Sequence, residues 1–264
     1  MAKIKSEHQF VWMFILNILL SPITLIHVLL RKKDFKQLFK PFEDLLSFVF
    51  EPKFTISIII ANIIIFIVSF SFSEQLIVSL INYPADLLNF RFYTIVTAAF
   101  LHASLTHLLG NMLGIFIFGR VVERKLGFSK TMVVYFGALV ISGLFQSLIH
   151  LFIIGDNTGG IGASGALMGL VSTAILLDPF YLTYELILPL PIMIIGWLTI
   201  YADIAGIINP TQDGIGHFAH IGGFISIALI MYFLGIKGRS KLKRGFLVNL
   251  VSLAVALNIY LFIV

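Results

Sequence analysis

Long apolar runs separated by short polar connections dominate the chain. The runs are continuous rather than alternating, as in Ile58-Ile59-Ile60, which favours membrane helices over transmembrane strands. Pro22 interrupts the first run and predicts an interfacial or broken helix there. The pattern predicts helical segments at about 10–30, 54–72, 102–122, 130–154, 163–177, 186–204, 215–236 and 246–264. We therefore expect an all-α, polytopic membrane protein.

Composition excludes a soluble globular protein. Of the 264 residues, 59% are hydrophobic and only 12% are charged, against roughly 25% charged in an average soluble domain. The mean hydropathy is +1.02. Cysteine is absent, which excludes disulfide frameworks, thiolate metal sites and cysteine nucleophiles.

The basic residues indicate how the chain lies in the membrane. Fifteen of the eighteen fall in three connections that share one side if all eight segments span. By the positive-inside rule that side is cytoplasmic. Within the first connection, 31–53, lysines alternate with apolar residues, which predicts a helix on the cytoplasmic surface. These clusters indicate anchoring to anionic membrane lipid rather than binding to nucleic acid.

Polar residues at membrane depth are costly, and here they gather in three regions. The first holds His107 and Asn111, which are spaced i, i+4 and so share one helix face. Their N–H groups can point at one place, although interhelical hydrogen bonding explains the pair equally well.

The second region contains Ser164, which follows the glycine-rich stretch 159–162. We expect this serine at or near a helix N-terminus, where free backbone N–H groups stabilise negative charge. A capping serine before a small-residue face, Gly165 to Gly169, is the alternative explanation.

The third region reads Gly216-His217-Phe218-Ala219-His220-Ile221-Gly222-Gly223. Its small residues allow another helix to come very close. A buried histidine satisfied by a carbonyl group is the plain interpretation of His220. A zinc site is disfavoured because no H-E-x-x-H motif occurs and no carboxylate accompanies the histidine pair.

Together the three regions form a consistent chemical set. A serine nucleophile needs a base within hydrogen-bond reach, and His220 can be that base for Ser164. The oxyanion of acyl transfer needs donors, which His107, Asn111 and the Ser164 backbone N–H can supply. On the expected topology, all these groups lie toward the non-cytoplasmic half of the membrane.

On these residues the chain resembles the rhomboid family of intramembrane serine proteases over about 54–236. The residues that carry the resemblance are His107 with Asn111, the stretch 162–165, the stretch 219–223, and Gly119-Arg120-Val121-Val122-Glu123 with Leu126-Gly127. The resemblance implies a six-helix core, with one extra helix after it and a further apolar segment before it. We expect three regions: an apolar segment and basic amphipathic linker at 1–53, a catalytic core at 54–236, and a basic cytoplasmic loop and C-terminal helix at 237–264.

The resemblance also implies roles for single residues. Ser164 would be the nucleophile and His220 the general base, in a dyad without a third acidic member, and His107 and Asn111 would help to form the oxyanion hole. Supporting positions are Gly162, Gly165, Met168, Ala219 and Gly223. Substrates would be single-pass membrane proteins cut in or near their transmembrane segment. We expect no cofactor, no metal, and a plasma-membrane location with the site open to the non-cytoplasmic side.

Two positions depart from the family pattern. Phe90-Arg91 stands where the family often has Trp-Arg. Met168 stands where the family commonly has a tyrosine packed on the catalytic histidine. Because Met168 lies one turn deeper than Ser164 on the same face, we expect its thioether to support the ring of His220.

Other functions stay open. A catalytically inactive relative would bind transmembrane clients without cutting them. A transporter would line its pathway with His107, Asn111 and Asp203, but the sequence lacks obvious paired half-helices. An intramembrane aspartyl protease is excluded because no Tyr-Asp or Gly-x-Gly-Asp pair is present. The sequence assigns no oligomeric state.

Overall fold

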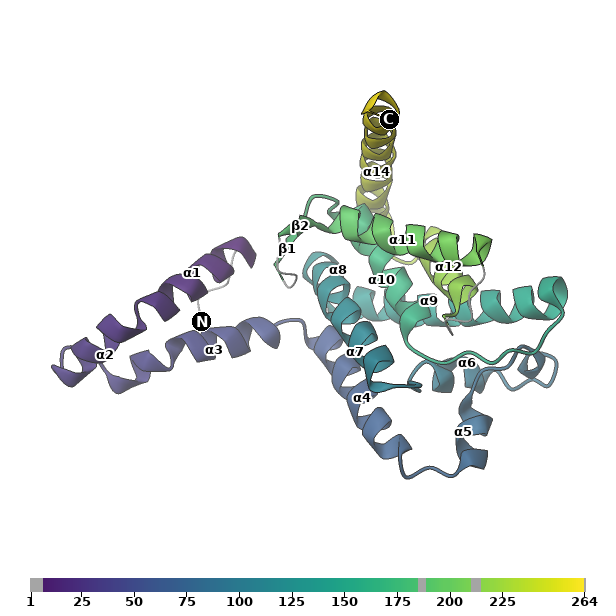
Figure 1. The fold of residues 1–264 in the computed structure, drawn as a ribbon, viewed down its shortest axis with the longest axis horizontal. Coiled ribbons are helices and arrows are strands. Elements are labelled where there is room, and N and C mark those ends of the chain that lie inside the picture. Colours follow the sequence, from purple (N-terminus) through teal and green to yellow (C-terminus); the bar gives the residue numbers. More distant parts are fainter. Residues whose placement is uncertain (1–6, 185–188, 210–214, 264) are drawn as a thin grey trace.

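A computed structural model describes residues 7–184, 189–209 and 215–263, and most of them are helical (Figure 1). The elements before residue 105 are α1 (Glu7–Leu19), α2 (Ser21–Leu29), η1 (Phe35–Leu38), α3 (Lys40–Val49), α4 (Lys53–Ser69), α5 (Glu74–Leu80), η2 (Pro84–Asp86) and α6 (Tyr93–Ala98). Those that follow are α7 (Leu105–Gly114), η3 (Ile115–Gly119), α8 (Arg120–Leu126), α9 (Phe128–Ile149), η4 (His150–Ile154), α10 (Ser164–Leu177), β1 (Leu182–Thr183), β2 (Leu190–Pro191), α11 (Ile192–Ile208), α12 (His217–Ile225), α13 (Ile227–Ile230) and α14 (Gly235–Ile263). The two short strands pair antiparallel. The predicted all-α membrane fold is confirmed.

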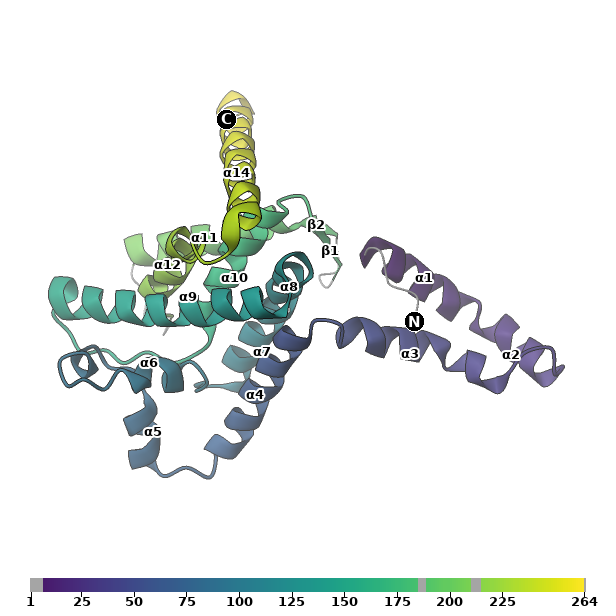
Figure 2. The same cartoon turned by 180° about the vertical axis from the view of Figure 1, so that it is seen from behind.

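The N-terminal segment is a broken helix that folds back on the basic linker. α1 and α2 meet at a bend of 52°, with Pro22 in the first turn of α2. α1 packs beside α3, where the rings of Phe10 and Phe48 stack with centroids 3.9 Å apart. This helical hairpin extends away from the rest of the molecule (Figures 1 and 2). The predicted surface helix of the linker corresponds to α3.

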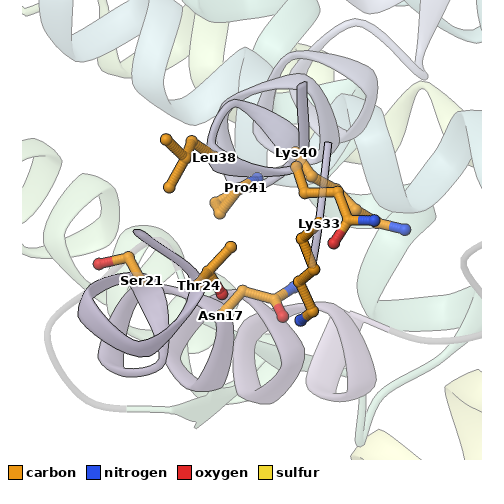
Figure 3. Close-up of a pocket in the computed structure, with 8 residues that line it drawn as sticks. Asn17, Ser21, Thr24, Lys33, Leu38, Lys40 and Pro41 are labelled. Carbon is orange, nitrogen blue, oxygen red and sulfur yellow. The ribbon is translucent and has the colours of Figure 1, made fainter. Parts of the chain in front are cut away.

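A polar cavity of about 200 Å³ lies inside this hairpin (Figure 3). Lys33 and Lys40 line it together with Asn17, Ser21 and Thr24. Two lysines beside neutral hydrogen-bonding groups make the cavity suited to an anion.

Within the described part of the chain, two helices are long and apolar enough to cross a membrane, Leu105–Leu126 and Phe128–Ile154. The first joins α7, the π-helical turn η3 and α8, and the second joins α9 and the π-helical turn η4. The count rises to four if each of two bent pairs is one span: α1 with α2, and α3 with α4, which meet at 84°. Shorter apolar helices are Ser164–Leu177, Ile192–Ile208 and His217–Ile230.

Three predicted segments begin or end elsewhere in the structure. The segment expected at 186–204 is α11, which starts only at Ile192, because Pro191 precedes it in an extended conformation; residues 185–188 lie outside the described part. The segment expected at 215–236 is interrupted at Ser226 and ends at Ile230. α14 begins at Gly235 rather than near 246, so the basic stretch expected to be a loop is helical.

The core is built around α10, which packs against α9, α11, α12 and α14. Small residues let these helices approach closely. A Cβ added at Gly169 would lie 2.1 Å from the Cβ of Ala138 on α9, and one at Gly196 of α11 would lie 2.6 Å from Ile175. The helix that begins at Ser164 is therefore fixed from several sides, which limits how far its first residues can move.

Candidate active site

Ser164 is the first residue of α10. At this position the backbone N–H has no acceptor within the helix. The preceding Gly162 has φ +109°, a conformation that side chains rarely adopt, so the chain reaches Ser164 through a turn that requires glycine. The predicted place of the serine at a helix N-terminus is confirmed.

The glycine-rich loop before Ser164 is held by the long connection 73–101. Asn82 and Gly160 form an isolated antiparallel bridge, and the N–H of Gly162 donates to the carbonyl of Ala98 at 2.8 Å. At the other end of the loop, Nδ1 of His150 lies 2.6 Å from the Asp156 carboxylate. That hydrogen bond lowers the pKa of the Asp156 carboxyl below its ordinary value.

His107 and Asn111 converge on this loop from α7. A Cβ added at Gly162 would lie 2.7 Å from Nε2 of His107 and 3.4 Å from Nδ2 of Asn111. The Asn111 side chain is 5% exposed, and its Nδ2 has no hydrogen-bond partner among the described residues. A buried donor without an acceptor is rare and requires an explanation. The expected shared helix face of the two residues is present.

The N-terminal turn of α10 touches α12 backbone to backbone. A Cβ added at Gly223 would lie 2.0 Å from the carbonyl oxygen of Gly165 and 3.1 Å from the Cβ of Met168. A Cβ added at Gly165 would lie 3.6 Å from the carbonyl oxygen of Ala219. Ser164 and His220 are each next in sequence to one of these contact residues. The two side chains therefore belong to the same end of the helix crossing.

This close approach gives a direct test. Gly223→Ala is expected to lower the melting temperature and cleavage together, because its methyl group would collide with backbone rather than with a movable side chain. Overpacking of this kind costs about 1–3 kcal/mol or more. The matched control is Gly110→Ala, whose methyl group meets nothing within 4 Å and should be neutral or slightly stabilising. Equal melting temperatures for both variants in one detergent would contradict the proposed contact.

Asp203 joins the site from α11, a role that the sequence did not reveal. Its Oδ1 accepts hydrogen bonds from Nδ1 of His220 at 2.7 Å and from Nδ1 of His217 at 2.9 Å. The expectation that no carboxylate accompanies the histidine pair is therefore wrong. Asp203 lies beside both histidines in the fold, although it comes from another helix. The available signal was an ionisable residue within an apolar helical run, which by itself suggests a functional site.

Not every expected contact is present. Among the described residues, no hydrogen bond joins Ser164 and His220. The side chain of His220 bonds to Asp203, and its backbone N–H donates to the Gly216 carbonyl. Such catalytic bonds are often long without substrate. Met168 is 1% exposed and packs beneath Gly223. Its support of the His220 ring stays a prediction.

Comparison with known proteins identifies the family. The family model described as "Rhomboid domain" matches residues 89–237, more than half of the chain. The chain belongs to the rhomboid family. It is 32% identical to Rhomboid protease GlpG of Yersinia pestis over 71% of its length, and 28% identical to RHOMBOID-like protein 12, mitochondrial, of Arabidopsis thaliana over 70%. It is also 27% identical to Rhomboid-like protein 11, chloroplastic, of the same plant over 67%. The matches span 64%, 59% and 64% of these relatives' own lengths.

In this rhomboid the departure at Phe90-Arg91 keeps a structural role for the arginine. Arg91 pairs with the buried Asp86 at 3.1 Å and donates to the carbonyl of Ser79 at 2.9 Å. Phe90 is 80% exposed and has φ +56°. The arginine thus ties together the connection that holds the loop before Ser164, while the phenylalanine ring points outward.

The rhomboid stretch 119–123 also has a clear structural role. A Cβ added at Gly119 would lie 3.0 Å from the Thr55 side chain, so the end of η3 and the start of α4 are in close contact. The carboxylate of Glu123 accepts hydrogen bonds from the N–H groups of Phe54 and Thr55, each at 2.9 Å. It therefore caps the start of α4.

Proposed function

We propose that this rhomboid is an intramembrane serine endopeptidase that cleaves single-pass membrane proteins in or near their transmembrane segment. The observation that carries the proposal is the buried Asn111 Nδ2, which lies beside the loop leading into Ser164 and has no hydrogen-bond partner in the described part of the chain. An oxyanion formed at Ser164 would give that donor its acceptor. The protease named among the relatives supports the same activity.

The proposed reaction uses Ser164 as nucleophile and His220 as general base. Oγ attacks the scissile carbonyl carbon, and its proton passes to Nε2 of His220. The imidazolium then gives this proton to the leaving amine, and water releases the acyl group by the same steps. Because the ionised carboxylate of Asp203 only accepts hydrogen bonds, Nδ1 of His220 carries the ring proton and Nε2 is left as the acceptor. Asp203 is thus a positioning residue.

The negative charge of the tetrahedral intermediate needs several donors. The Ser164 N–H at the start of α10, Nδ2 of Asn111 and a ring N–H of His107 are the groups that we assign to it. Donors fixed before the reaction need no reorganisation when charge develops, which is why such groups contribute strongly to the rate.

Asn111→Ala is expected to lower kcat by roughly 10²- to 10³-fold if Asn111 is a dominant oxyanion donor. The melting temperature should stay unchanged or rise, because the substitution removes a buried donor for which the described residues supply no acceptor. The measurement is kcat and apparent substrate affinity on a single-pass reporter, with melting in the same detergent.

Asn258→Ala is the control for Asn111→Ala, since Asn258 is exposed on α14 and its side-chain NH₂ donates to the Ala254 carbonyl of its own helix. It should leave both constants unchanged. A change confined to apparent affinity would move Asn111 from the oxyanion hole to substrate binding. If the melting temperature falls and the loss of rate matches the loss of folded protein, the role of Asn111 is structural.

The alternative is a catalytically inactive rhomboid that binds transmembrane clients. Both proposed dyad residues are present, which favours the protease. The deciding experiment is fluorophosphonate labelling of the detergent-solubilised protein. An active serine should be labelled at Ser164, whereas an inactive relative should not react there.

We propose that the site opens on the membrane face opposite the basic connections. The plasma membrane expected from the sequence gains no support from the relatives, two of which are named as mitochondrial and chloroplastic. We also propose that 54–236 form the catalytic core, and that the hairpin before it contacts anionic membrane lipid. The polar cavity with Lys33 and Lys40 supports this lipid contact (Figure 3).

A further inference from the structure

The Asp203 cluster has the composition of a metal site. The ligand atoms of Asp203, His217 and His220 all lie within 4.8 Å of one another. The second carboxylate oxygen of Asp203, Oδ2, is buried and has no hydrogen-bond partner among the described residues. Asp203 itself is 4% exposed. Oδ1 of Asp203 therefore accepts hydrogen bonds from both imidazoles, while Oδ2 remains available to bind a cation.

The spacing of residues on α11 and α12 brings these three side chains close together. His217 and His220 are spaced i, i+3 on α12, so they share the face that meets α11. Asp203 and Gly206 are likewise spaced i, i+3 on α11. A Cβ added at Gly206 would lie 2.2 Å from Nε2 of His217. Only a glycine there leaves room for the ring of His217 against α11.

We propose that Asp203, His217 and His220 bind a divalent transition metal of the zinc class, and that this metal inhibits the protease. Two imidazoles and one carboxylate with an open position form a common zinc ligand set. Zinc–ligand bonds of about 2.0–2.2 Å place neighbouring ligand atoms about 3.4 Å apart in a tetrahedral site. Small side-chain rotations therefore suffice to close the cluster around one ion.

Inhibition follows from the tautomer of His220, and this step rests on the proposed function. Neutral imidazole carries one ring proton. A metal ion bound to Nδ1, the nitrogen that faces Asp203, takes the lone pair there and moves the proton to Nε2. A protonated Nε2 cannot accept the proton of Ser164. Metal binding and general-base action at His220 are thus mutually exclusive.

Zinc binding is tested first on a variant that lacks the proposed nucleophile, so the result does not depend on proteolysis. Full-length Ser164→Ala protein in detergent is titrated with ZnCl₂ by equilibrium dialysis with ⁶⁵Zn. One equivalent is expected to bind, and adding His217→Gln should weaken binding at least 10-fold. His27→Gln, on α2, is the matched control and should bind like the parent. Absence of binding, or equal binding with and without His217, would overturn the metal site whether or not the chain is a protease.

The second arm measures cleavage of a single-pass reporter. Zinc should inhibit the parent protein, and a chelator should restore its rate. For His217→Gln, the rate with chelator is the variant's own reference, and zinc should lower that rate far less than it lowers the parental rate. Zinc that binds without slowing an active protease would overturn the inhibitory role. If the protein binds zinc through His217 but cleaves nothing, the metal site is supported and the proposed protease function fails.

Discussion

Ser164→Ala and His220→Ala are each expected to abolish cleavage of a single-pass reporter while the protein still folds. Nucleophile and base act as one unit, so the loss in the double variant should equal the loss in either single variant rather than their product. Each single loss should be at least 10⁴-fold, on the order seen when a serine–histidine pair is broken. The measurement is kcat/KM for all three variants beside the parent.

Two controls separate chemistry from folding. Ser172→Ala removes another buried serine of α10, whose hydroxyl donates to the Gly169 carbonyl of its own helix. This variant should keep most of the activity. His27→Ala removes a histidine of α2 and should also keep most of the activity. If either Ser164→Ala or His220→Ala retains more than a trace of activity, the assignment of nucleophile and base is wrong.

The sequence was sufficient for features that depend on local pattern. Continuous apolar runs predicted helices because only helices satisfy their own backbone in lipid. The glycines before Ser164 predicted a tight entry into a helix, and α10 begins at that serine. The i, i+4 spacing of His107 and Asn111 predicted a shared face, and both side chains approach Gly162.

Features that depend on distant partners were not predictable from pattern alone. Arg120 counted as one of the cytoplasmic basic residues, yet it is 0% exposed. Its guanidinium group donates to the backbone carbonyl of Phe48. The guanidinium carbon also lies 3.4 Å from the centroid of the Phe48 ring. Nothing near Arg120 in the chain indicates that a residue of the N-terminal hairpin will supply both contacts. The position of α3 against α8 decides whether this cation is solvated or buried.

Helix ends were missed for a related reason. The basic stretch after Gly235 was expected to form a loop, but lysine and arginine are good helix formers, so charge alone does not end a helix. Gly235 has φ +79°, and that backbone reversal sets the start of α14. A run of basic residues therefore does not by itself show where a helix begins.

Asp203 is the site residue for which this limit matters most. It precedes His220 on a different helix, so no spacing rule links them, and only the packing of α11 on α12 brings the two side chains together. Asp203→Asn is expected to lower kcat on the order of 10³- to 10⁴-fold with a small change in apparent affinity. A neutral amide removes the charge that stabilises the imidazolium, and its NH₂ group can hold His220 in the wrong tautomer.

A merely structural Asp203 would give a different pattern of results. The pH profile of kcat should change in Asp203→Asn, because the substitution removes a negatively charged group that is hydrogen-bonded to the proposed general base. Asp203→Glu should recover part of the rate by restoring the charge at a longer reach. These profiles are measured with melting temperatures in one detergent.

Asp178→Asn is the matched control for Asp203→Asn. Asp178 follows the far end of α10 and pairs with Lys125 at 2.6 Å on the partly exposed side of the molecule. Removing that charge should cost less than about 1 kcal/mol of stability and leave the pH profile unchanged. If Asp203→Asn keeps the parental rate and profile, another group must set the tautomer of His220. If it loses rate only in proportion to its loss of folded protein, Asp203 holds α11 against α12 and takes no part in proton transfer.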